Sequence, residues 1–168
     1  MLKTLKTYLE NNLSKATKIA VLGIGSELRQ DDAAGIVAAK LIKEVGLKQN
    51  RGVKVKVFIG ETAPENLTGE IKAFKPSHII LIDTVDMGEK PGTVAVLKPQ
   101  EIGEGVSFST HTMPAKILSD YFSKSFKCDI TMLGIQPSSV KFGNKFNRHV
   151  KQSSEDVAKA INSAIANL

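Results

Sequence analysis

Three separated residues, Asp32, Asp83 and His111, have side chains that can bind a divalent metal ion or act as acids and bases. Two carboxylates and one imidazole make an oxygen–oxygen–nitrogen ligand set that suits an ion such as zinc or nickel. Such a set leaves coordination positions open for water or substrate. Because 51 and 28 positions separate the three residues, each belongs to a different segment. Their chemistry requires a fold that brings three distant segments together.

The elements available to position these residues alternate between strands and helices. Short apolar or β-branched runs predict strands at 18–24, 53–59, 78–83, 93–97 and 129–135. Helical patterns follow them at about 32–45, after a Thr62–Glu65 capping box, after Pro114, and from about Ser153 to the C-terminus. This alternation predicts an α/β fold, a three-layer α/β/α sandwich with a twisted, mostly parallel central sheet of about five strands.

We expect one domain over residues 1–168, with residues 1–14 as an N-terminal helical extension laid on it. Leucines at helical spacing define the buried face of that extension: Leu2, Leu5, Leu9 and Leu13. The charged residues among them exclude a signal peptide or a transmembrane span at this end of the chain.

Open parallel sheets place their sites at the carboxyl ends of the strands, where all three candidate residues are expected. Asp32 follows the first strand, Asp83 ends the apolar 78–83 run, and His111 lies in a polar loop that leads into a helix. Each also has a structural interpretation: helix cap, turn acceptor and loop histidine respectively. Spacing alone leaves both interpretations open.

For the other residues that could carry chemistry we expect structural roles. For Asp31 we favour a cap at the start of the 32–45 helix, and for Asp86 a turn. His78 and His149 are expected to be solvated or structural. Cys128 is expected to be a small core residue. Because it is the one cysteine of the chain, an internal disulfide and a cysteine-built zinc site are excluded.

Nucleotide binding is disfavoured by the loop after the first strand. Leu28 stands where a dinucleotide fingerprint needs its third glycine, no phosphate-binding Gly-Lys-Ser/Thr motif occurs, and Asp31 and Asp32 would repel phosphate. A nucleotide- or flavin-binding α/β domain therefore remains only a weak alternative.

The net charge of +6 does not by itself indicate nucleic acid, since the 23 Lys and Arg residues are scattered and aromatic residues make up only 5%. A basic surface can equally steer an acidic protein partner. We expect no nucleic-acid partner, no membrane span, a cytoplasmic location and a monomer.

The chain resembles the hydrogenase maturation endopeptidases, which remove the C-terminal extension of the large subunit of a nickel–iron (NiFe) hydrogenase. The resemblance covers about residues 18–137 and is closest to the formate-hydrogenlyase-type branch. Five segments carry it: Gly23-Ile-Gly25 with Asp31-Asp32-Ala-Ala-Gly35, Ala63-Pro-Glu-Asn66, Ile82-Asp83-Thr-Val-Asp86-Met-Gly88, Thr110-His-Thr-Met-Pro114 and Leu133-Gly-Ile-Gln-Pro137.

The resemblance implies that Asp32, Asp83 and His111 form the catalytic and metal-contacting set. It also implies that the metal is nickel carried by the large-subunit precursor, not an ion that the protease retains. Hydrolysis then proceeds by metal-assisted positioning, which we favour, or with Asp32 or Asp83 as general base, as in an aspartic-type endopeptidase. The leading alternative is a non-enzymatic module that senses nickel or a partner through the same residues.

The sequence departs from the family pattern in three places. Ser26 replaces a common asparagine, Gln30 and Ala33 replace common glycines, and Glu61 stands in what is frequently a Gly-Gly-Ser/Thr turn. The substitutions at residues 26, 30 and 33 bear on the flexibility of the loop that carries Asp32, and the one at residue 61 bears on a loop that contacts substrate in the family.

Overall fold

A computed structural model describes residues 2–46, 52–97, 107–108, 121 and 124–168 of the chain. Its central sheet has the strand order β2-β1-β3-β6-β4, with a short β5 paired to β3. β2, β1, β3 and β6 run parallel, whereas β4 and β5 are antiparallel to their partners. The mostly parallel sheet predicted from the sequence is therefore confirmed. The strands are β1 (Lys18–Ile24), β2 (Lys54–Glu61), β3 (His78–Asp86), β4 (Val94–Leu97), β5 (Ser107–Phe108) and β6 (Asp129–Ile135).

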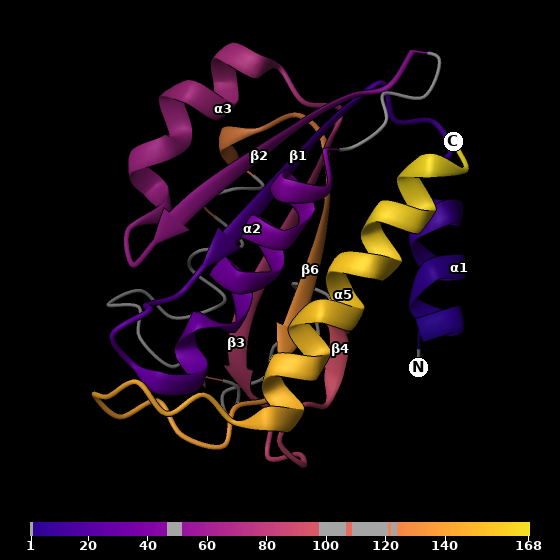
Figure 1. The fold of residues 1–168 in the computed structure, drawn as a ribbon. Helices are drawn as coiled ribbons and strands as arrows, with labels where there is room; N and C mark the ends of the chain where they lie inside the picture. Colours follow the sequence, from indigo (N-terminus) through magenta and orange to yellow (C-terminus); the bar gives the residue numbers. More distant parts are fainter. Residues whose placement is uncertain (1, 47–51, 98–106, 109–120, 122–123) are drawn as a thin grey trace.

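Helices cover both faces of this sheet, as the predicted three-layer sandwich requires (Figure 1). On one face α1, α2 and α5 pack against alternate strand residues such as Ile80 and Ile82. On the other face α3 packs against the intervening residues, including Ile79 and Leu81. The apolar runs are continuous because each strand contributes to both cores. The helices are α1 (Leu2–Leu13), α2 (Ala34–Val45), α3 (Thr68–Phe74) and α5 (Arg148–Ala166), with 3₁₀ turns η1 (Gln30–Ala33) and η2 (Pro64–Leu67).

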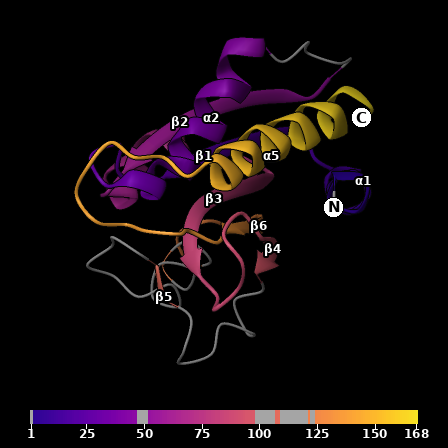
Figure 2. The ribbon, with the colours of Figure 1, turned by 60° about the horizontal axis from the view of Figure 1, so that its bottom comes forward.

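The N-terminal helix α1 is more than a surface extension. It lies beside α5 in both views (Figures 1 and 2), and Leu5, Leu9 and Leu13 belong to the same buried cluster as the helix residues of α2 and α5. Leu9 and Leu13 are fully buried. The leucine spacing that predicts the helix therefore also identifies residues of the main core.

Shortening a buried side chain of α1 is expected to destabilise the whole domain. Leu9→Ala removes a fully buried side chain and should lower the free energy of unfolding by about 3 kcal/mol, measured by urea denaturation. Leu2→Ala, at a more exposed position on the same helix, should change it by under about 0.5 kcal/mol. Equal, small effects of the two variants would mean that α1 is dispensable for the core.

Two expected helix starts were wrong. The Thr62 capping box does not form, because Pro64 fixes the first residue of η2 and makes Ala63 the N-cap. The terminal helix begins at Arg148 and not near Ser153, because Asn147 caps it by accepting the backbone N–H of His149 at 2.9 Å. Ser153 lies inside the helix and donates to the carbonyl of Gly92.

One further expected helix, after Pro114, lies largely outside the described residues, but residues 121, 124 and 125 at its end are described and are helical. Within the part of the chain that the structure describes, no helix is both long and apolar enough to cross a membrane.

Candidate active site

Asp32 and Asp83 lie at the carboxyl edge of the sheet, where the sequence predicts a site. Asp32 is in η1, directly after β1 and its loop, and Asp83 is in β3, the next strand in the sheet. Both side chains are fully buried. Figure 2 brings this edge of the molecule forward. The topology therefore brings two of the three candidate residues to one place.

Close packing of α2 on the strand ends fixes the position of Asp32. A Cβ at Gly35 would collide with the backbone carbonyls of Ile24 and Ile82, one from each neighbouring strand. At Gly25, φ is +137°, and a Cβ there would collide with the carbonyl of Asp32. Only glycine fits at these two positions, and the resulting close approach of the turn and α2 to the strands places Asp32 at the edge of the sheet.

Asp83 is in an environment that disfavours its charge. Burial raises the pKa of Asp83 well above its usual value, and the nearby charge of Asp32 raises it further. A hydrogen bond from the backbone N–H of Thr84, at 2.7 Å to Oδ1, offsets part of this effect. Two buried carboxylates close enough to interact are stabilised when a proton or a cation lies between them.

The sequence analysis places Asp83 at the end of its strand, and this was wrong. β3 continues to Asp86, because Asp83 and Thr84 still pair with β6 and the next two residues pair with β5. What ends at this point is the pairing between β3 and β1, whose last partners are Ile82 and Gly23. Asp83 therefore lies where the sheet opens on one side, which is consistent with a site.

His111 lies outside the described residues, so its place beside the two aspartates stays a prediction. Among the residues that the structure does describe, no group of three or more His, Cys, Asp or Glu side chains is arranged to hold a metal ion. The described part of the candidate set is the Asp32–Asp83 pair.

Asp31 is a structural residue, but it does not cap its own helix. Its carboxylate accepts the backbone N–H groups of Ser138 at 2.7 Å, Ser139 at 3.1 Å and Asn147 at 2.6 Å. The side chain is almost fully buried. Asp31 therefore fastens the loop between β6 and α5 to the turn that carries Asp32. Sequence spacing gave no sign of this role, because more than 100 residues separate the partners.

Gln136 is a second residue that the sequence argument left without a role, although it lies in the Leu133–Pro137 motif. Its Oε1 accepts the backbone N–H groups of Met87 at 2.6 Å and Glu89 at 3.2 Å, and its Nε2 donates to Asp86 at 3.1 Å. Asp86 also accepts the N–H of Gly88, so its predicted turn role is confirmed. Gln136 thus shapes the loop that follows β3.

The remaining histidines and the cysteine have the structural character expected of them. His78 is buried and shares a 2.8 Å hydrogen bond with Thr131, and burial lowers its pKa. His149 is exposed in the first turn of α5. Burial raises the pKa of the Cys128 thiol to about 11, so this thiol is not activated as a nucleophile.

The substituted glycine positions keep a glycine-like backbone. Gln30 and Glu61 both have φ of +47°, in the left-handed region that glycine favours, whereas Ala33 has an ordinary helical φ of −68°. Gln30 is held there by a 3.0 Å hydrogen bond from its N–H to the carbonyl of Gly143. Neighbouring contacts therefore maintain the turn before Asp32 without glycine at residue 30.

A doubly covered, mostly parallel sheet with a candidate acidic centre at its carboxyl edge defines the class of this protein as an α/β enzyme. The family model for hydrogenase maturation proteases matches residues 36–164. The chain belongs to the hydrogenase maturation protease family and is a hydrolase of the endopeptidase type.

Individual relatives agree with this assignment. A relative from Methanocaldococcus jannaschii is 35% identical over 141 residues, covering 82% of this chain and 83% of its own. The hydrogenase 3 maturation protease of Escherichia coli K12 is 31% identical over 141 residues, which cover 84% of this chain and 86% of that protein.

Solved structures show the same fold. The crystal structure of a NiFe hydrogenase maturation protease from Thermococcus kodakarensis KOD1 superposes with a TM-score of 0.78 at 30% identity, covering 96% of this chain and 99% of that one. The part of this chain that the match leaves uncovered is shorter than α1, which has 12 residues. At least part of the N-terminal helix is therefore included in the structural match.

Proposed function

We propose that the protein removes the C-terminal extension of a NiFe hydrogenase large-subunit precursor, and that it recognises nickel already bound to that precursor. The observation that carries the proposal is the buried Asp32–Asp83 pair at the carboxyl edge of the sheet. Its oxygen donors suit a divalent cation, and the burial that raises the pKa of Asp83 makes the negative charge of this carboxylate costly unless a cation lies beside it.

We propose a division of roles that the resemblance to the family implies and the buried position of Asp32 and Asp83 supports. Asp32 and Asp83 would hold nickel that is part of the substrate, and His111 is proposed as the third ligand. The metal would polarise the scissile carbonyl or a water molecule, and the bond that is cut would be selected by its distance from the nickel. Catalysis by one aspartate as general base remains the second route.

The family assignment favours this enzyme over the two alternatives from the sequence, a non-enzymatic nickel-sensing module and a nucleotide- or flavin-binding domain. We further propose that the enzyme acts as a monomer in the cytoplasm, on a protein substrate and not on nucleic acid.

The proposal is tested by incubating the protein with a large-subunit precursor that has been purified with and without nickel, and following the mass of the C-terminal fragment. We expect cleavage of the nickel-loaded precursor alone. Equal cleavage of both forms would refute recognition through nickel, and cleavage of neither would refute the proposed substrate.

A matched pair of variants ties the result to the site. Asp32→Asn should abolish cleavage, whereas Asp129→Asn, at an exposed aspartate on the amino end of β6, should leave it within about twofold of the wild type. Loss of cleavage in both variants would point to a general effect of charge and not to the acidic pair.

A further inference from the structure

Two exposed apolar side chains lie on the loops beside the candidate site. Leu28 is 71% exposed and Phe142 is 75% exposed, although large apolar residues are usually covered in a domain of this size. Leu28 is four residues before Asp32, and Phe142 lies in the loop that Asp31 fastens to the same turn. The two exposed positions therefore border the carboxyl edge of the sheet.

Backbone hydrogen bonds join the two segments. The N–H of Gly143 donates to the carbonyl of Leu28 at 3.0 Å, and the N–H of Gln30 donates to the carbonyl of Gly143 at 3.0 Å. The guanidinium of Arg29 lies over the Phe142 ring, 4.9 Å from its centroid. Leu28 and Phe142 are therefore presented from neighbouring segments with a fixed backbone, which we call the Leu28/Phe142 patch.

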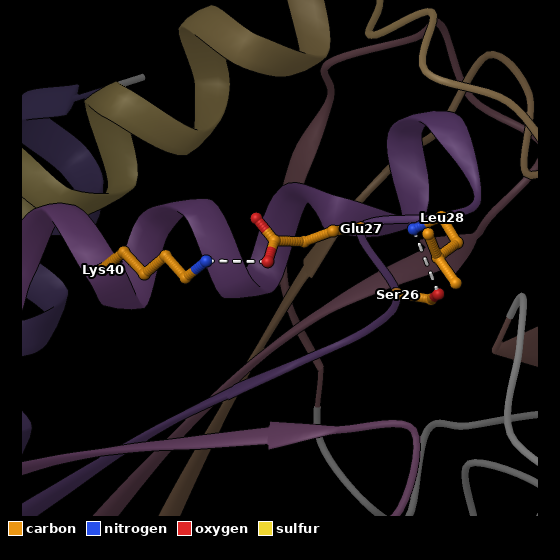
Figure 3. Close-up of polar contacts among 4 residues, drawn as sticks. All are labelled: Ser26, Glu27, Leu28 and Lys40. Carbon is orange, nitrogen blue, oxygen red and sulfur yellow. Dashed lines mark hydrogen bonds and ion pairs between the residues drawn. The ribbon is translucent and has the colours of Figure 1, made fainter.

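The loop is also held from its other side. Figure 3 shows the Lys40 side chain of α2 reaching Glu27, with a 2.7 Å ion pair between them, and the N–H of Leu28 donating to the Ser26 hydroxyl at 3.3 Å. These local contacts fix the backbone around Leu28 while its side chain stays in solvent. A preformed exposed apolar surface costs little ordering entropy when a partner covers it.

The loop that carries Phe142 is basic. The segment 137–148 contains no acidic residue, and its exposed basic residues are Lys141, Lys145 and Arg148. Glu27, the acidic residue nearest to Leu28 in sequence, is paired with Lys40. A partner that fits this surface has apolar side chains bordered by carboxylates.

We infer that the Leu28/Phe142 patch docks the folded surface of the large-subunit precursor next to the peptide that is cut. The inference rests on the proposed function, since the loop that carries Leu28 leads directly to Asp32 and the loop that carries Phe142 is hydrogen-bonded to it. The patch supplies affinity for the protein body, while the acidic pair engages the metal-bearing segment. Recognition is then divided between two surfaces of the enzyme.

The test measures KM and kcat for cleavage of a nickel-loaded precursor by patch variants. Phe142→Ser should raise KM about tenfold with most of kcat retained, because truncating a central apolar contact weakens binding but leaves the acidic pair in place. Val45→Ser is the matched control, since Val45 is 68% exposed but lies at the far end of α2 from Asp32. An unchanged KM for Phe142→Ser would overturn the inference, as would an equal rise for Val45→Ser.

A charge variant covers the case in which Phe142→Ser folds poorly. Lys141→Glu combined with Lys145→Glu should raise KM about tenfold at low salt, and the difference from the wild type should shrink at high salt. A KM that is insensitive to both charges and salt would contradict the acidic border assigned to the partner.

Binding of the precursor to the inactive Asp32→Asn protein separates failure of this inference from failure of the proposed function. Binding that Phe142→Ser weakens about tenfold supports the docking surface even if no cleavage by the wild type is seen. Cleavage by the wild type together with binding that ignores the patch refutes the docking surface alone. Absence of both binding and cleavage refutes both.

Discussion

Asp83→Asn is expected to abolish precursor cleavage and, at the same time, to raise the free energy of unfolding at neutral pH. Activity should fall by at least about 10³-fold, because an amide has no negative charge to bind nickel and does not accept a proton as a general base. Stability should rise by about 1–3 kcal/mol, because folding raises the pKa of the buried Asp83 carboxyl and so costs free energy at neutral pH, and the amide does not carry this cost. The Thr84 N–H retains an acceptor in the amide oxygen.

The stability gain is expected to depend on pH in a definite direction. Because the pKa of Asp83 is higher in the folded protein than in the unfolded chain, the folded state binds the proton more tightly. Wild-type stability should therefore fall as pH rises from about 4, the unfolded value, through the raised folded value. Asp83→Asn lacks this loss, so the gap between the two proteins opens over that range and then stays constant.

Urea denaturation of both proteins between pH 4 and pH 8 measures this gap, with Asp129→Asn as the exposed control. A stability difference that is constant across the range, or an Asp83→Asn protein that is less stable at pH 7, would contradict a strained acidic pair. In that case Asp83 would have a structural role and would lose its standing as a metal-contacting residue.

Asp31→Ala is expected to be among the most destabilising substitutions in the loops of this protein. It removes the acceptor of three backbone N–H groups, from Ser138, Ser139 and Asn147, and leaves them to find water or remain unsatisfied. The free energy of unfolding should fall by about 3 kcal/mol, measured in urea. Precursor cleavage should fall as well, because the turn that carries Asp32 loses its attachment.

Two variants distinguish this role from a simple charge effect. Asp31→Asn keeps one acceptor oxygen but turns an N–H₂ group toward backbone donors, so its loss should be smaller than that of Asp31→Ala yet still measurable. Asp156→Ala removes a carboxylate on α5 that accepts a 3.1 Å hydrogen bond from the exposed Gln152, and it should stay within about 0.5 kcal/mol of the wild type. Equal effects of Asp31→Ala and Asp156→Ala would refute the fastening role.

Local patterns in the sequence were sufficient for the elements and their layers. The β6 run at 129–135 is found with the predicted bounds, and three of the four leucines that predict the buried face of α1 are buried, the exception being the exposed Leu2. Such patterns predict the elements correctly because the apolar residues that face the core recur with a different period in a helix than in a strand. Element ends were harder to predict, since Thr62 and Ser153 could also begin a helix. Pro64 at the first position of η2 and Asn147 as the N-cap of α5 decide where the two helices start.

The sequence by itself determined that Asp32 and Asp83 face the same edge of a parallel sheet, because both follow apolar strand residues in an alternating chain. Only the tertiary structure decided that the two are fully buried and interact, that Asp83 lies at the end of β1 pairing, and that Asp31 fastens a loop from the other end of the chain. The reason is that burial, charge coupling and loop attachment depend on contacts between segments up to 116 residues apart, on which local spacing carries no information.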